Sequence, residues 1–85
     1  MSTTSREEIL LSVKQVVAEE TGKQISAIDE GLTFHSLGLD SISVIVILDA
    51  LENKYGVSLT PLHFWDHPTI GAFTDFLTNE LNKKV

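Results

Sequence analysis

The sequence predicts an all-α protein, a small four-helix bundle of three main helices and one short helix. Three segments, residues 6–21, 41–55 and 70–82, repeat apolar residues at intervals of three and four, the period of an amphipathic helix. Each segment follows a residue type that commonly caps helices, and the first two end at a glycine. A further segment, 61–65, begins at a proline and is long enough for about one helical turn. We expect a single domain over residues 1–85, because this length supplies one small core.

The first helix is bounded by a capping signal at each end. Ser5 with Glu8 three residues later is a capping-box pattern, and Gly22 stands where a glycine commonly ends a helix. Between these signals the apolar residues fall on one face: Ile9, Leu10, Val13, Val16 and Val17. The pattern predicts a helix over 6–21 that turns this face to the core.

Residues 41–55 pose a choice between helix and strand, since β-branched side chains, which favour strands, crowd the first half of the segment. The length of the segment, the capping residues Asp40 and Ser41, and the pair Tyr55-Gly56 favour a helix. On that helix one stripe faces the core: Val44, Ile47, Leu48, Leu51 and Tyr55.

The opposite side of this helix carries more aliphatic surface than a core needs. Three aliphatic residues stand there beside two carboxylates: Ile42, Ile45 and Val46 with Asp49 and Glu52. One interpretation is that a neighbouring loop covers the aliphatic residues, since scattered exposed apolar side chains are common. The other is a surface on which partner proteins dock, an apolar patch with a carboxylate rim.

The remaining segments complete the bundle. Residues 22–40 have no sustained period, and we expect them to lie across the bundle, with one short helical turn near 26–30, pinned by Ile25, Ile28, Leu32, Phe34, Leu37 and Leu39. Thr60 and Pro61 predict the start of the short helix. Thr69 is the expected cap of the last helix, whose buried stripe is Ile70, Phe73, Leu77 and Leu81, with Lys83 and Lys84 near its negative end.

The composition limits the partners. Twelve acidic residues against six Lys and Arg give a net charge of −6, which argues against nucleic acid and anionic membranes and favours partners with basic patches. There is no cysteine, so no disulfide, thiol nucleophile or thiolate metal site is available. No apolar run approaches the roughly 20 residues of a membrane span, and the N-terminus lacks a signal-peptide pattern. We expect a soluble, cytoplasmic monomer.

A self-contained active site is not expected, because the chain is too short for a cleft between two lobes. Ser41 stands outside a G-x-S-x-G elbow, and no histidine is placed by local spacing to act as its base. His63 and His67 stand at the spacing of a metal-binding pair, but Pro68 argues against the continuous helix that such a pair needs. We expect both histidines to have a structural role near Trp65.

Ser41 allows two interpretations. As a helix cap, its hydroxyl would accept a hydrogen bond from an amide of the first turn. As an attachment point, its oxygen would place a phosphate at the positive end of the helix, near amides that the helix start leaves unpaired. The position suits a phosphodiester as well as a hydroxyl.

Three stretches together resemble one known family. Leu37-Gly38-Leu39-Asp40-Ser41-Ile42 is similar to the attachment motif of acyl and peptidyl carrier proteins. The stretch 51–57, Leu-Glu-Asn-Lys-Tyr-Gly-Val, resembles the end of the second helix of these carriers. The stretch 64–70, Phe-Trp-Asp-His-Pro-Thr-Ile, resembles a segment common in carriers of polyketide and nonribosomal peptide synthases. The likeness covers nearly the whole chain in the right order.

The resemblance implies a carrier that is not itself an enzyme. In the family, a phosphopantetheinyl transferase moves 4′-phosphopantetheine from coenzyme A to the serine that Ser41 matches, in a magnesium-dependent step. Asp40 matches the acidic residue that helps to position this magnesium. The thiol of the arm then holds intermediates as thioesters for acyl- or aminoacyl-loading and condensing enzymes, which we expect to dock on Ile42, Ile45, Val46, Asp49 and Glu52.

The chain also departs from the family pattern. Ile42 replaces the leucine most often found after the serine, so the transferase that accepts this chain is an open question. Our leading hypothesis is an acyl carrier for polyketide or related secondary-metabolite synthesis. A fatty-acid carrier and a peptidyl or aminoacyl carrier are the alternatives within the family. An unmodified helical interaction module and, less favoured, a small hydrolase built on Ser41 are the alternatives outside it.

Overall fold

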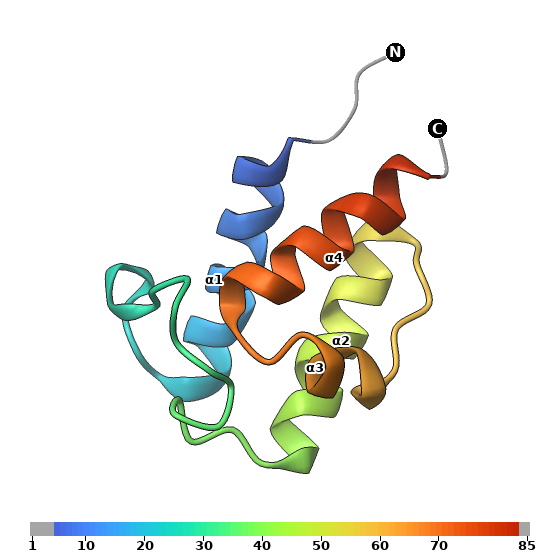
Figure 1. The fold of residues 1–85 in the computed structure, drawn as a ribbon. Helices are drawn as coiled ribbons and strands as arrows, with labels where there is room; N and C mark the ends of the chain where they lie inside the picture. The colour runs from blue at the N-terminus through green and yellow to red at the C-terminus, as the bar shows by residue number, and fades with distance from the viewer. Residues whose placement is uncertain (1–4, 84–85) are drawn as a thin grey trace.

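Four α-helices and one 3-10 turn make up the described part of the chain, residues 5–83 of a computed structural model. The helices are α1 (Arg6–Thr21), α2 (Ser41–Tyr55), α3 (Pro61–Asp66) and α4 (Ile70–Asn82), and the turn η1 covers Ile25–Ala27 (Figure 1). Within residues 5–83 there is no strand, only an isolated bridge between Thr33 and Thr69. The predicted all-α fold is confirmed, and α3 is one residue longer than expected.

The predicted capping signals explain most of the helix boundaries. Ser5 and Glu8 form the expected capping box of α1, and Gly22 ends that helix with φ of 75°. Thr60 caps α3 ahead of Pro61, and the Thr69 hydroxyl accepts from the backbone N–H of Ala72 at 3.0 Å at the start of α4. Of the two lysines expected near the end of α4, Lys83 is the C-cap residue and Lys84 lies outside the described residues.

The core lies where α1 packs against both α2 and α4, while α3 packs on α2 (Figure 1). Each main helix contributes fully or nearly fully buried aliphatic or aromatic side chains: Ile9, Val13 and Val17 from α1, Ile47, Leu48 and Leu51 from α2, and Ile70, Phe73 and Leu77 from α4. Val44, Tyr55 and Leu81, which we placed in the buried stripes, are only partly buried and pack at the edge of the core. The helical choice for 41–55 is therefore confirmed, because its apolar stripe meets the core with a helical period.

The connection between α1 and α2 lies across the bundle, but its short turn is Ile25–Ala27 rather than 26–30, and Ile25 is exposed and does not pin it to the core. Ile28, Phe34 and Leu37 are buried, and Phe34 stacks on Phe64 with ring centroids 3.9 Å apart and meets the edge of Phe73. Backbone bonds tie the connection to the start of α4, with Ile70 N donating to Leu32 O at 3.0 Å. These contacts hold in place the segment that leads into α2.

A charged cluster holds the middle of this connection, next to Leu32. Arg6 of α1 donates to Glu30 of the connection at 2.6 Å and also pairs with Asp75 of α4. Gly71 N donates to Glu30 O at 2.9 Å, and a Cβ at Gly71 would lie 2.9 Å from a Glu30 carboxylate oxygen. A side chain at Gly71 would therefore require the Glu30 carboxylate to move and the nearby backbone, with Glu30 O at 3.3 Å, to shift slightly.

Candidate functional site

Asp40, rather than Ser41, caps α2. Asp40 has an extended backbone, and its Oδ1 accepts a hydrogen bond from the backbone N–H of Ser43 at 2.8 Å. The interpretation of Ser41 as the cap is thus wrong, because Ser41 is already the first residue of the helix. Ser41 is exposed, and no hydrogen bond to its Oγ is found within residues 5–83. The hydroxyl is therefore open to an incoming group.

The Asp40 carboxylate is held in its charged form. The backbone N–H of Ser43 is the main cause that lowers the Asp40 pKa below its ordinary value, and the Ser43 side chain and the Ile42 amide add to the effect. A negative charge at this end also complements the helix dipole. An ionised carboxylate thus stands one residue before the open hydroxyl of Ser41.

The turn before Asp40 depends on Gly38. Gly38 has φ of 77°, a left-handed conformation that strains residues with a Cβ, and its N–H donates to His35 O at 3.0 Å. Leu37 on one side of this glycine is buried, and Leu39 on the other packs against the core. The turn therefore holds the chain against the core immediately before Asp40 and Ser41, which lie at the surface.

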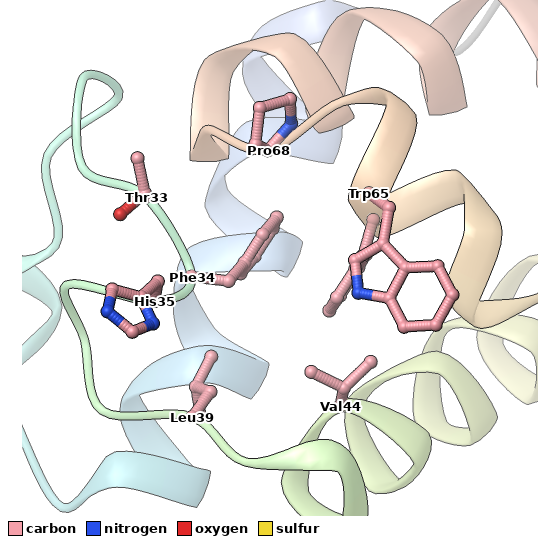
Figure 2. Close-up of a pocket in the computed structure, with 8 residues that line it drawn as sticks. Thr33, Phe34, His35, Leu39, Val44, Trp65 and Pro68 are labelled. Carbon is pink, nitrogen blue, oxygen red and sulfur yellow. The ribbon is translucent and has the colours of Figure 1, made fainter.

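Two hollows adjoin this corner. One, of about 270 Å³, is bordered by Ser41 and Asp40 and is closed on the α3 side by Pro61 and Trp65. The other, also about 270 Å³, is lined by residues of the connection before α2 and of α3, and Figure 2 shows Phe34, His35 and Leu39 on one side of it with Val44 and Trp65 on the other. Both hollows share Leu39, Val44 and Trp65 among their lining residues.

Trp65 was not expected at the site. Its side chain is 71% exposed, although tryptophan is usually among the more buried residues. Leu62, three positions earlier in α3, is 59% exposed, whereas Phe64 between them is buried. The spacing of three residues puts Leu62 and Trp65 on one face of α3, but this local signal does not place that face beside Ser41.

The five residues expected to form a docking surface lie on the outward side of α2, but they are not equivalent. Ile42, Ile45 and Val46 are 73%, 55% and 46% exposed, so the long connection does not cover them. Asp49 is exposed as well. Glu52 is only partly exposed, and its Oε2 accepts a hydrogen bond from the backbone N–H of Leu59 at 2.8 Å. Glu52 therefore holds the link between α2 and α3.

His63 lies in α3, and His67 is the C-cap residue of that helix. Both have a structural role, but they contact Phe76 rather than Trp65. The His63 and His67 rings lie 4.5 and 4.7 Å from the Phe76 ring, and His63 Nδ1 accepts from Thr60 N at 3.1 Å. No group of three or more metal-ligating residues occurs within residues 5–83. Over the same range, no helix is long and apolar enough to cross a membrane.

The comparison with family models decides the class of the protein. Residues 12–77 match the model of the phosphopantetheine attachment site. The chain belongs to the phosphopantetheine-binding carrier family. Members of this family carry covalently attached 4′-phosphopantetheine. The start of α2 fits such a group, because the Ser41 hydroxyl is exposed at the positive end of a helix.

Relatives of two kinds share this carrier sequence. The acyl carrier protein of Arthrobacter sp. (strain FB24) is 34% identical over 76 residues, which cover 88% of this chain and 94% of that protein. A non-reducing polyketide synthase of Cladonia grayi is 36% identical over 69 residues, which cover 81% of this chain. The matched part is only 3% of the length of that synthase.

A solved structure gives the same fold. It is described as a free-standing peptidyl carrier protein from an uncharacterized secondary metabolic pathway of Acinetobacter baumannii. It is 32% identical, with a TM-score of 0.86, over 91% of this chain and 96% of that one. The similarity thus includes acyl and peptidyl carriers, and carrier domains of synthases work with partner synthase enzymes.

Proposed function

We propose that this chain is an acyl carrier for polyketide or related secondary-metabolite synthesis, with 4′-phosphopantetheine attached to Ser41. The observation that carries the proposal is the exposed Ser41 Oγ, without a hydrogen bond from residues 5–83, beside the ionised Asp40. Similarity to polyketide synthases and to an acyl carrier protein supports the acyl cargo. We also propose that the carrier is not itself an enzyme and that it is located in the cytoplasm, as the sequence led us to expect.

Ser41 and Asp40 have separate roles in this proposal. The Ser41 hydroxyl is the acceptor of the phosphopantetheinyl group, which a separate transferase moves from coenzyme A with magnesium. The Asp40 carboxylate holds the first turn of α2 through Ser43 and supports the magnesium of the transferase. Once attached, the arm supplies the thiol that a chain without cysteine lacks. The outward side of α2 is the surface on which the partner enzymes dock.

Intact mass tests the attachment. The chain is incubated with coenzyme A, magnesium and a broad-specificity phosphopantetheinyl transferase, and a second transferase is tried because Ile42 adjoins Ser41. Wild type is expected to gain the mass of one phosphopantetheinyl group, and Ser41→Ala none. If neither protein gains mass with either transferase, the proposal fails and the unmodified interaction module takes its place.

A peptidyl carrier is the second candidate, favoured by the similarity to the Acinetobacter baumannii structure. The phosphopantetheine-loaded chain separates the two cargoes when it is offered to aminoacyl-loading and to acyl-loading enzymes in parallel. Formation of an acyl thioester alone supports the acyl carrier. Formation of an aminoacyl thioester alone supports the peptidyl carrier.

A further inference from the structure

The short helix α3 is held at its start by a histidine. The backbone N–H of Thr60, the N-cap residue, donates to His63 Nδ1 at 3.1 Å, and His63 N donates to Thr60 O at 3.0 Å. His63 therefore has the position in a capping box at which glutamate or glutamine commonly accepts from the N-cap amide. Unlike those two residues, histidine changes its charge between pH 8 and pH 5. The start of α3 thus depends on a group that responds to pH near neutrality.

Only the neutral ring of His63 can make this bond. A ring nitrogen that accepts a hydrogen bond carries no proton, so the single ring proton of His63 is on Nε2. A second proton binds at Nδ1, and both nitrogens of an imidazolium are donors. The Thr60 N–H and the new Nδ1–H would then point at each other with no acceptor between them. Protonation of His63 therefore breaks the bond at the start of α3.

Phe76 of α4 offers the charged ring another partner. The centroids of the His63 and Phe76 rings lie 4.5 Å apart, with an angle of 35° between the ring planes. His67 stacks on the same phenyl ring at 4.7 Å and is the other group that can gain a proton there. An aromatic face attracts a cation at such distances, so the protonated His63 ring can stay on Phe76 when it leaves Thr60. His63 thus has one contact that requires the neutral ring and one that tolerates the charged ring.

Within residues 5–83, no carboxylate is fixed beside either of these histidines. No ion pair joins His63 or His67 to an acidic residue in that part of the chain. The charged residues of the helices around His63 have other contacts or are exposed: Glu52 accepts from Leu59 N, Asp75 pairs with Arg6, Glu80 pairs with Lys83, Lys54 lies over the Tyr55 ring, and Asp49 and Asp66 are exposed. The charge of His63 is therefore set by the contest between the Thr60 N–H and the proton, without a carboxylate that holds the ring in its charged form.

The start of α3 also forms part of the wall beside Ser41. Pro61 and Trp65 close the α3 side of the hollow that Ser41 borders. The helix has only six residues, and a helix this short depends on its caps and its packing because it has few internal hydrogen bonds. Phe64 is 2% exposed and keeps α3 on the core, whereas Trp65 is 71% exposed. Loss of the bond at the helix start therefore frees the outer face of α3 without detaching the helix.

We propose that His63 is a proton-sensitive latch of α3. With a neutral ring the latch is closed, because Nδ1 holds the Thr60 N–H and fixes the wall of the hollow beside Ser41. With one proton taken from solvent at Nδ1 the latch is open: the ring stays on Phe76, the first turn of α3 loosens, and Trp65 moves relative to Ser41. No covalent bond changes, so the step reverses when the pH rises. The inference goes beyond the proposed function, since the latch operates with or without a group on Ser41.

Two signals follow the latch in the full chain between pH 8 and pH 5. The Thr60 amide proton reports the bond in NMR spectra, and Trp65, the single tryptophan of the chain, reports the wall by its fluorescence. We expect the Thr60 amide proton to move upfield as it exchanges His63 for water, and the fluorescence of Trp65 to change with the same midpoint as the ring protons of His63. Different midpoints for the His63 ring and the Thr60 amide would overturn the proposal, and wild type alone supplies this result.

Three glutamine variants assign the change to one histidine. His63→Gln keeps an acceptor for the Thr60 N–H but cannot gain a proton in this range, so both signals should stay at the values that wild type has at pH 8. His67→Gln removes the other histidine next to α3, and His35→Gln removes the histidine that lines a hollow together with Trp65 (Figure 2). Both of these control variants should keep the wild-type transition.

The outcomes that contradict the latch are distinct. A change of Trp65 fluorescence that persists in His63→Gln, or that is lost in His35→Gln or His67→Gln, would assign the transition to another histidine. A Thr60 amide that titrates with His63 while Trp65 stays unchanged would show that protonation does not reach the wall beside Ser41. Either result refutes the proposal.

Discussion

Asp40 has two roles that two substitutions separate. Asparagine caps helices about as well as aspartate, whereas alanine does not cap them. Asp40→Ala should lower the thermal unfolding midpoint by a few degrees, whereas Asp40→Asn should lower it less, because the bond to Ser43 N survives and only the contribution of the charge is lost. Both variants should load phosphopantetheine at least about ten-fold more slowly, because the carboxylate that supports the magnesium of the transferase is gone. Normal loading of Asp40→Asn would leave Asp40 with a structural role only.

The same carboxylate makes stability depend on pH in a defined direction. The Asp40 pKa lies below its ordinary value of 3.8, because the backbone N–H of Ser43 stabilises the charged form. The charge therefore adds stability above pH 3.8, and this contribution is lost as the pH falls through the lowered pKa of the folded state. The free energy of unfolding of wild type minus that of Asp40→Asn should shrink over this range. A difference that stays constant down to about pH 2 would contradict the pKa shift.

At the scale of structural elements, the connection between α1 and α2 has no sustained helical or strand period of its own. The buried ring of Phe34 holds it to the rest of the bundle. Phe34→Ala should lower the free energy of unfolding by about 3–5 kcal/mol, because a buried ring that contacts Phe64 and Phe73 is lost. Leu11→Ala is the control, since Leu11 is 49% exposed on α1 and should change stability by less than about 0.5 kcal/mol. Urea unfolding measures both. Equal effects would mean that the connection is not held by its aromatic contacts.

The outward side of α2 is expected to serve recognition rather than folding. Ile45→Glu should retain the helical circular dichroism of wild type, because Ile45 is 55% exposed, and should slow transfer to partner enzymes several-fold. Leu11→Glu is matched to it in chemistry and exposure but lies on α1, and it should transfer normally. Loss of helical signal in Ile45→Glu would place this residue in the core instead.

The helices could be predicted from the sequence because their boundaries depend on local chemistry. Ser5, Gly22, Thr60, Thr69 and Gly56 act through hydrogen bonds or backbone conformations that involve only a few neighbouring residues. The choice between Asp40 and Ser41 as the cap could not be made in this way, since both types cap helices, and only the extended backbone of Asp40 in the structure identifies it as the cap.

The rest of the site depends on contacts between distant segments. Glu52 was expected to face partners, but its bond to Leu59 forms only when the link after α2 folds back. Trp65 stands beside Ser41 because α3 packs on α2, which no local pattern specifies. The Phe76 contacts of His63 and His67 likewise follow from where α4 passes α3.

Over the whole molecule, the distribution of charge complements the proposed function. The six lysines and arginines stand at positions 6, 14, 23, 54, 83 and 84, so the outward side of α2 and all of α3 lack them. That surface combines exposed aliphatic residues, Trp65 and carboxylates next to Ser41. Enzymes with basic patches are attracted to such a surface at a distance and oriented before contact.

The measurement that tests the central claim most directly is the site of modification in the loaded chain. After reaction with coenzyme A, magnesium and transferase, fragmentation mass spectrometry locates the phosphopantetheinyl group among Ser36, Ser41 and Ser43. We predict a single group on Ser41 and none on the other two, because only Ser41 pairs an open hydroxyl with the ionised Asp40 at the start of α2. A group on Ser36 or Ser43, or loading that persists in Ser41→Ala, would contradict the account.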